Sequence, residues 1–186
     1  MWFNIKMRKL KITELNRLTR DEFQQTRKTP LVVVLDNVRS LHNVGSVFRT
    51  GDAFLIEAIY LCGITSTPPH PEIHKTALGA EDTVRWTYFE DTCQAVEQLK
   101  ADGYTVFAVE QVEGSILLPN LSLKANQQIA VVFGNEVKGV QQKVIDLCDG
   151  CIEIPQFGTK HSLNVSVTAG IIIWELFKKM NDGLER

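Results

Sequence analysis

Short apolar runs, separated by polar turns and by segments of helical periodicity, recur along most of the chain. The runs are rich in β-branched residues, and they lack the alternation of polar and apolar positions that marks a strand with one wet face. Such runs are typical of strands buried on both faces of a parallel sheet. They predict buried strands at Leu31–Leu35, Ala58–Cys62, Thr105–Glu110, Ile129–Phe133 and Ile152–Ile154, with a further strand at Arg85–Phe89.

Helices are predicted between these strands. In Val44–Leu55 the apolar residues recur at helical spacing, and further helices are expected at a short segment ending near Leu78 and at Thr92–Ala101, Gln141–Cys148 and Leu163–Met180. The segment Gly114–Leu123 is apolar but irregular and is interpreted as a link. Strands that alternate with helices predict an α/β domain with a mainly parallel sheet and helices on both faces.

The N-terminal segment differs from the rest in charge. Residues 1–30 carry eight Lys or Arg against three acids, a balance of +5, which leaves −7 on residues 31–186. Residues 8–28 are expected to form two short helices, with Thr19 as a cap, and Pro30 ends this extension. We therefore predict a basic helical extension, 1–30, that meets a polyanion, on a domain formed by 31–186. A solvated helical surface is the alternative, and Met7 is a second candidate for the start of the chain.

Composition excludes several classes of protein. The 186 residues suffice for one domain with a core, and the 44% hydrophobic share is that of a globular protein. No apolar run approaches the ~20 residues that span a bilayer, so we expect no membrane partner and a cytoplasmic location. Cys148 and Cys151 form a CxxC, but no second pair completes a zinc site, so structural thiols are expected. His70 and His74 stand four apart without a clear third ligand, and no metal is predicted.

The ligand of such a sheet is expected beyond the carboxyl ends of its strands. Four polar turns follow strands there: Asp36–Asn43, Glu110–Gly114, Gly134–Gly139 and Pro155–Asn164. The last three belong to the C-terminal half and could form one site. The chain contains no GxG, no GxxxxGK[ST] and no GxSxG motif. A dinucleotide fingerprint, a P-loop and a nucleophile elbow are therefore excluded, and the ligand should be held by backbone and apolar contacts.

Three motifs then carry a resemblance to a known family. They are Asn37-x5-Asn43-x-Gly45-x3-Arg49, Phe133-Gly134-Asn135-Glu136-x2-Gly139, and Ile154-Pro155-x2-Gly158-x3-Ser162-Leu163-Asn164-Val165-Ser166-x2-Ala169. In this order and spacing the chain resembles the SpoU/TrmH family of RNA ribose 2′-O-methyltransferases, in the SPOUT superfamily. The resemblance extends from Leu31 to Met180.

The resemblance implies a C-terminal deep trefoil knot, which physical reasoning from sequence would have rejected because knots are essentially absent from proteins. It also implies S-adenosylmethionine as the cofactor, with Gly134, Ile154, Ser162, Leu163 and Asn164 around it and Val109–Glu110 as a less certain wall. Gly134 would leave room for the adenine. Glu136 is expected to order its loop or the start of a helix. The alternative is that it stabilises, as an N-terminal acid, the helix beginning near Val140.

The reaction implied is attack of a ribose 2′-hydroxyl of tRNA or rRNA on the sulfonium methyl group, without a metal. The family resemblance makes Arg49 the catalytic residue and gives Asn43 a role at the helix start, the target ribose or Arg49. A guanidinium is effectively always charged, so we expect Arg49 to clamp a phosphate; a base role would require unusual desolvation. The resemblance also implies a homodimer in which the first motif of one subunit faces the cofactor of the other.

Two alternatives stay open at the level of sequence. One is a non-catalytic RNA-binding protein of the same fold, and the other is a SPOUT enzyme that methylates a base. The Ser162-Leu163-Asn164 signature favours the ribose branch, and the short extension slightly favours tRNA over rRNA.

Overall fold

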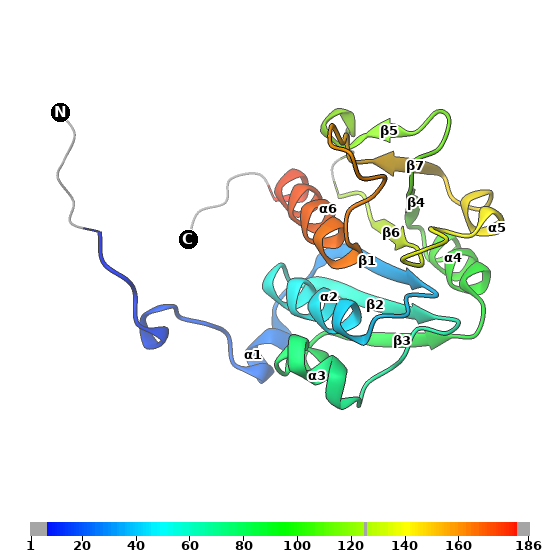
Figure 1. Cartoon of the computed structure of the whole chain (residues 1–186). Helices are drawn as coiled ribbons and strands as arrows, with labels where there is room; N and C mark the ends of the chain where they lie inside the picture. Colours follow the sequence, from blue (N-terminus) through cyan, green and yellow to red (C-terminus); the bar gives the residue numbers. More distant parts are fainter. Residues whose placement is uncertain (1–6, 125, 182–186) are drawn as a thin grey trace, which may run out of the picture.

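A computed structural model of the protein describes residues 7–124 and 126–181. Residues 1–6 of the predicted basic extension lie outside this range. In chain order the helices and strands are η1 Ile12–Glu14, α1 Arg20–Gln25, β1 Thr29–Asp36, α2 Leu41–Ala53, β2 Ile56–Cys62, α3 Pro71–Ala77, η2 Ala80–Asp82, β3 Trp86–Phe89, α4 Thr92–Ala101, β4 Thr105–Val109, β5 Ile116–Leu117, η3 Leu118–Asn120, β6 Ile129–Phe133, α5 Gln142–Ile145, β7 Gly150–Glu153 and α6 Val165–Met180 (Figure 1).

One seven-stranded sheet organises these elements, in the order β3-β2-β1-β6-β4-β7-β5. Every neighbouring pair is parallel. Strand β1 lies between β2 and β6, where Val34 stands opposite Tyr60 on one side and Val132 on the other. The prediction of a mainly parallel α/β sheet is confirmed.

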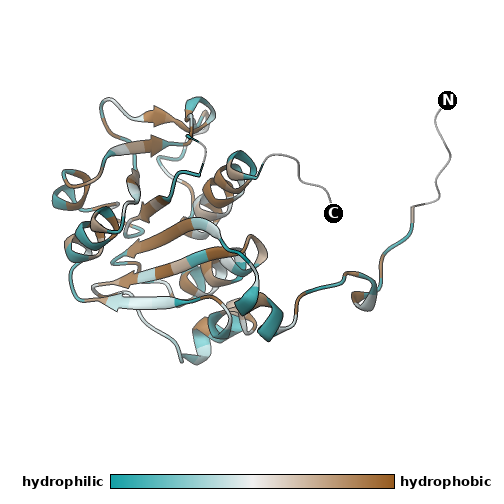
Figure 2. Ribbon diagram, turned by 180° about the vertical axis from the view of Figure 1, so that it is seen from behind, coloured by the Kyte–Doolittle hydropathy of each residue, from teal (hydrophilic) through white to brown (hydrophobic). Residues whose placement is uncertain are grey.

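Each face of the sheet has its own apolar core. On one face Leu31, Val33 and Leu35 of β1 join buried residues of α2, α3 and α6. On the other face Val32 and Val34 join buried residues of α4 and α5. Figure 2 shows the apolar, brown central strands with helices on both sides. Because alternate residues of one strand enter opposite cores, the continuous apolar runs in the sequence follow directly from the two-sided burial.

Several predicted boundaries were wrong. The strand predicted at Arg85–Phe89 is present as β3, an edge strand with exposed Trp86 and Tyr88, but other boundaries differ. The predicted link Gly114–Leu123 contains the short strand β5 and the 3₁₀ helix η3, and the helix predicted to reach Cys148 ends at Ile145. Strand β5 has only two residues, too few to show the period-2 pattern that identifies a strand.

The N-terminal extension forms one 3₁₀ turn and one helix, where two short helices were predicted. The cap predicted at Thr19 is confirmed, because its hydroxyl accepts a hydrogen bond from the Glu22 amide. Phe23 of α1 is buried in the core, and the Arg20 guanidinium donates to the Asp82 carbonyl oxygen at 2.8 Å. Strand β1 begins at Thr29 and so includes the predicted boundary, Pro30; a proline is tolerated there because it lies at the start of the strand.

A buried carboxylate ties the carboxyl end of β1 to its surroundings. Asp36 is fully buried and accepts hydrogen bonds from the Thr92 hydroxyl at 2.6 Å and from the Gln141 backbone and side-chain amides at 3.0 and 2.8 Å. The Asn37 side-chain amide donates at 2.8 Å. Buried polar groups are tolerated when they are satisfied in this way, and the contacts fix α4 and the segment before α5 against β1.

We predict that Asp36→Asn lowers the free energy of unfolding by about 2 kcal/mol, because an amide nitrogen would face donors that now meet a charged acceptor. Urea denaturation would measure the change. The matched control is Asp146→Asn on the surface, where the exposed carboxylate accepts a hydrogen bond from the Gln142 side chain; it should change stability by less than ~0.5 kcal/mol. Equal effects of the two substitutions would contradict a special role for Asp36.

Candidate cofactor pocket

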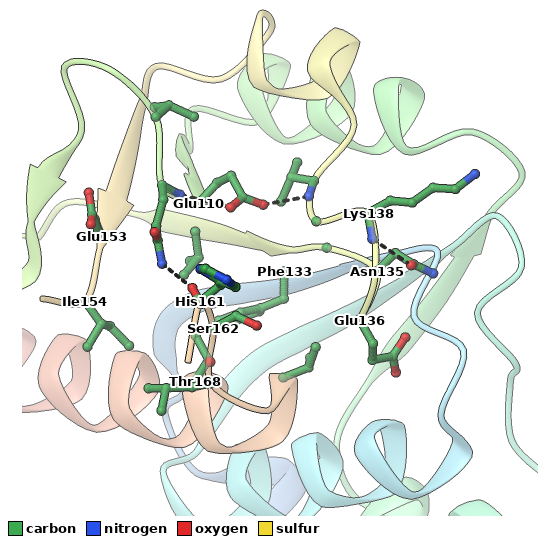
Figure 3. Close-up of a pocket in the computed structure, with 18 of the residues that line it drawn as sticks. Glu110, Phe133, Asn135, Glu136, Lys138, Glu153, Ile154, His161, Ser162 and Thr168 are labelled. Atoms are coloured by element: carbon green, nitrogen blue, oxygen red, sulfur yellow. Dashed lines mark hydrogen bonds between the residues drawn. The ribbon is translucent and has the colours of Figure 1, made fainter. Parts of the chain in front are cut away.

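A cavity of about 740 Å³ opens at the carboxyl ends of β4, β6 and β7 (Figure 3). All five residues predicted to bind the cofactor line it: Gly134, Ile154, Ser162, Leu163 and Asn164. Val109 and Glu110, the less certain wall, line it as well. The three polar turns of the C-terminal half therefore meet in one place, as the parallel sheet required.

Gly134 is where two backbone segments approach most closely. A Cβ atom built on it would lie 2.1 Å from both the Gly139 carbonyl carbon and the Val140 backbone nitrogen. Backbone atoms at this distance leave no room for a side chain on residue 134. The glycine is thus required by the neighbouring turn of its own chain, a different reason from the space for an adenine that the sequence suggested.

The turn from Gly134 to Val140 is held in a fixed shape. Asn135 and Gly139 exchange backbone hydrogen bonds at 3.0 and 2.9 Å. Gly139 has a φ of +67°, and the Glu110 carboxylate lies against it, 2.1 Å from where a Cβ would stand. The same carboxylate accepts a hydrogen bond from the Val140 amide at 3.0 Å. One wall of the cavity is therefore organised by the protein alone.

A chain of hydrogen bonds links this turn to α2 and α6. The Glu136 carboxylate accepts from the backbone amides of Arg39 and Ser40, at 3.0 and 2.9 Å, and from the Asn43 side chain at 3.0 Å. The Asn164 side-chain amide donates to the side-chain oxygen of Asn43 at 3.1 Å. Glu136 does order a helix start, but that helix is α2, so the alternative of a helix near Val140 was wrong.

Burial raises the pKa of Glu136, but the hydrogen bonds from the Arg39 and Ser40 amides more than offset it and bring the pKa below its usual value. The carboxylate is therefore ionised at neutral pH while it accepts these hydrogen bonds. At the other end of the chain, Asn164 caps α6 by accepting from the Ser166 amide at 2.9 Å. Asn43 is buried and joins Glu136 to Asn164 through its side-chain hydrogen bonds, while Ser40 is the N-cap of α2.

Arg49 lies apart from this arrangement. It is exposed on α2 and is not among the residues that line the cavity. The Asn43 side chain is hydrogen-bonded to the cavity wall at Asn164 and Glu136. The structure therefore brings the predicted cofactor residues together around one cavity, and the predicted catalytic arginine is not among the residues that line it.

Other candidate residues have structural partners. Burial raises the pKa of the Cys148 thiol to about 12 and raises that of Cys151, which fits thiols held in the protein interior. His70 caps α3 through the Glu72 amide, and the His74 ring contacts the Glu81 carboxylate at 2.5 Å. Within residues 7–124 and 126–181, no group of three or more His, Cys, Asp or Glu could hold a metal ion.

Sequence reasoning missed the contact that holds the far rim of the cavity. The Gln111 side chain donates to the His161 carbonyl oxygen at 2.9 Å, across 50 positions. No local pattern marks either residue, because both follow strands in polar turns. His161 itself lines the cavity.

We predict that Gly134→Ala lowers the free energy of unfolding by at least about 3 kcal/mol or prevents folding, because backbone atoms occupy the position of the added methyl group. Thermal denaturation followed by circular dichroism would measure it. The control is Gly158→Ala, where no heavy atom lies within 4 Å of the added Cβ, and stability should stay the same or rise by up to about 1 kcal/mol. A Gly134→Ala protein as stable as the wild type would contradict the close approach.

We predict that Glu136→Gln lowers the free energy of unfolding near pH 7 by about 1–2 kcal/mol, since one amide donor would face backbone donors. The folded-state pKa is depressed, so the stabilisation is complete above the unfolded value of about 4.3 and is lost as the pH falls through the lower folded value. Urea titrations between about pH 7 and pH 3.5 should show the two proteins converging. A difference that stays constant over this range would exclude the carboxylate as its source.

Comparison with known proteins agrees with the geometry. The model of the SpoU rRNA Methylase family matches residues 30–174. A Staphylococcus aureus protein, assigned by its name to the TrmH family of tRNA/rRNA methyltransferases, is 31% identical over 166 residues, which cover 87% of this chain and 66% of that protein. The chain thus spans slightly less than two thirds of the length of this curated relative.

Solved structures share the fold. The A. aeolicus TrmH/SpoU tRNA modifying enzyme matches with a TM-score of 0.75 and 26% identity, over 86% of this chain and 79% of that chain. An AdoMet-bound rRNA methyltransferase from Sinorhizobium meliloti matches with a TM-score of 0.74 and 26% identity, over 83% and 59%. In the described residues no helix is both long and apolar enough to cross a membrane. The family model covers most of the sheet and the whole cavity wall, and the chain belongs to the SpoU rRNA methylase family.

Proposed function

We propose that the protein transfers the methyl group of S-adenosylmethionine to a ribose 2′-hydroxyl of RNA, either tRNA or rRNA, in the cytoplasm. The observation that carries this proposal is the meeting of Gly134, Ile154 and Ser162–Asn164 around one cavity. These residues belong to the second and third family motifs, and the matched relatives include an AdoMet-bound rRNA methyltransferase.

The cavity suits the proposed cofactor. Its volume of about 740 Å³ lies within the ~300–1,000 Å³ of small-molecule sites. Ile154 and Leu163 supply apolar surface, and the turn Gly134–Gly139 supplies backbone groups. We also propose that the chain after β7 threads through the preceding loop as a trefoil knot. The contact between Gln111 and His161, which joins the segment after β7 to the turn after β4, supports that path.

The cofactor, when bound, would supply an electrophilic methyl group whose leaving group is a neutral thioether. The protein must then align the ribose oxygen with that methyl group and stabilise the charge that develops. Arg49 would bind the phosphate beside the target ribose through its planar guanidinium. Asn43 would position α2, and with it Arg49, through its two hydrogen bonds to Glu136 and Asn164.

We propose a homodimer, because one subunit does not hold Arg49 at its own cavity. The α6 side chains Val167, Ile171 and Trp174 are 51%, 38% and 44% exposed and recur at helical spacing on one face. Leu163, at the cavity, is 39% exposed and continues this apolar surface. A second copy packed there would cover the surface and could bring its own Arg49 to the cavity.

Methyl transfer from labelled S-adenosylmethionine to RNA from cells that lack the protein would test the function. Digestion to nucleosides then identifies the modified group. A 2′-O-methylated nucleoside is the expected product, and a methylated base would favour the second SPOUT branch. Cofactor or RNA binding without any transfer would favour a non-catalytic RNA-binding protein.

We predict that Arg49→Ala lowers kcat by at least about 100-fold, because a charge-stabilising contact to the reacting RNA is lost. The affinity for S-adenosylmethionine, measured by calorimetry, should be unchanged, since the group that Arg49 is proposed to bind is a phosphate of the RNA and not part of the cofactor. The matched control is Arg85→Ala, which removes an exposed arginine next to β3. Loss of cofactor binding in an intact Arg49→Ala dimer would contradict this assignment.

Mixing two inactive variants would test whether subunits share a site. Leu163→Asp places a charge in the cavity, while Arg49→Ala leaves the cavity intact. Mixed dimers then contain one complete site, and an equal mixture should recover about a quarter of wild-type activity after subunit exchange. A mixture that stays inactive after exchange would show that each subunit supplies its own arginine.

A further inference from the structure

The segment formed by residues 155–163 joins β7 to α6 and supplies part of the cavity wall. Four of its residues line the cavity, namely Gln156, His161, Ser162 and Leu163. The last three are also exposed, so this part of the segment lies between the cavity and solvent. Ser162 and Leu163 are among the residues proposed to hold the cofactor. The shape of the 155–163 segment therefore decides the shape of the proposed site.

The 155–163 segment is anchored firmly only at its two ends. Just before it, β7 pairs with β4 and β5, and just after it Asn164 caps α6. Between these points positions 157–163 are all exposed, and the Phe157 side chain is 96% exposed. Few buried contacts and an exposed backbone are the marks of low local stability. Packing therefore contributes little to holding the middle of the segment in place.

A single hydrogen bond holds the segment between its ends. Within residues 7–124 and 126–181, the one hydrogen bond that joins 155–163 to another part of the chain runs from the Gln111 side-chain amide to the His161 carbonyl oxygen, at 2.9 Å. Because a peptide group is planar, a fixed His161 carbonyl also fixes the direction of the Ser162 N–H. No described residue accepts a hydrogen bond from that N–H, so it is available to a ligand in the cavity.

Gln111 is itself held in place by its neighbour in the chain. The Gln111 backbone amide donates to the Glu110 carboxylate at 3.0 Å, and the same carboxylate accepts from the Val140 amide at 3.0 Å. Figure 3 draws the contact at Glu110 and the contact at His161 as dashed lines. Two consecutive residues after β4 thus hold the turns that follow β6 and β7.

We propose that Gln111 is a positioning residue for the cofactor, an inference that rests on the proposed function. Its side-chain amide holds the peptide group between His161 and Ser162 in the orientation that the cofactor requires. When this hydrogen bond breaks, the 155–163 segment opens the cavity to solvent, and the cofactor enters or leaves. Gln111 acts through the backbone of His161, so it governs retention of the cofactor and not the transfer of the methyl group.

Limited proteolysis tests the contact in the ligand-free protein, because Lys160 is exposed within the segment and offers a site for trypsin. In Gln111→Leu, a side chain of similar size cannot donate. Cleavage after Lys160, measured by mass spectrometry relative to cleavage after the exposed Arg17, should become about 3- to 10-fold faster, as expected for the loss of one hydrogen bond from the closed form. The matched control is Gln98→Leu, on an exposed side chain of α4 that donates to Asp102; it should be cleaved like the wild type.

Two further measurements separate retention of the cofactor from chemistry. S-adenosylhomocysteine, followed by stopped-flow displacement, should dissociate about 3- to 10-fold faster from Gln111→Leu than from the wild type. The single-turnover rate of methyl transfer, at saturating S-adenosylmethionine and RNA, should stay within about twofold of the wild-type rate. Bound S-adenosylhomocysteine should also slow cleavage after Lys160 in the wild type.

Equal cleavage of Gln111→Leu and the wild type would show that Gln111 does not hold the segment. Faster cleavage with an unchanged dissociation rate, or a single-turnover rate reduced about 10-fold or more, would overturn the positioning role as well. In each of these results the wild type still methylates RNA, and the proposed function stands. A wild type that binds no S-adenosylhomocysteine and transfers no methyl group would overturn the proposed function and the positioning role together, while the cleavage rates would still decide whether Gln111 holds the segment.

Discussion

The Glu136 carboxylate accepts hydrogen bonds from the backbone of Arg39 and Ser40 and from the side chain of Asn43, and through Asn43 it reaches Asn164. These partners lie about a hundred positions apart in the sequence, on the turns that follow β1, β6 and β7 and on the first turn of α2. Ordering three turns costs conformational entropy of about 1–2 kcal/mol for each backbone position. A charged acceptor with several donors, itself partly shielded from water, is among the stronger polar contacts that can offset such a cost.

The shape of the cavity depends on a second constraint, which is steric. The turn Gly134–Gly139 folds back so closely that its first residue has no room for a side chain, and its last residue has a φ of +67°. A wall made in this way presents backbone groups to a ligand in a geometry that is set before binding. Such preorganisation reduces the entropy that binding would otherwise cost. The polar chain through Glu136 and the tight turn therefore act together, because each fixes one end of the same segment.

The sequence predicted the sheet well because the two cores select β-branched residues at consecutive positions, and this pattern is local. It also indicated which turns form the site, since parallel strands bring their carboxyl ends to one edge. The hydrogen-bond partners of Glu136 could not be predicted from the sequence. A carboxylate in a polar turn has many possible partners, and the choice of the two amides just before α2, 96 and 97 positions away, is made by the whole fold. The reason for Gly134 was missed similarly, because a close backbone crossing leaves no pattern among its neighbours.

The same chain of contacts gives the separation of Arg49 from the cavity a physical meaning. Glu136 and Asn164 belong to the cavity wall, and Asn43 belongs to α2, which also carries Arg49. If the wall rearranged on binding a ligand, the hydrogen bonds that join Asn43 to Glu136 and Asn164 would change. The position of α2 would change with them. In a dimer with shared sites, α2 of each subunit would serve the cavity of the other. Cofactor binding in one subunit would then be coupled to the arginine that acts in its partner, with Asn43 as the residue through which the coupling passes.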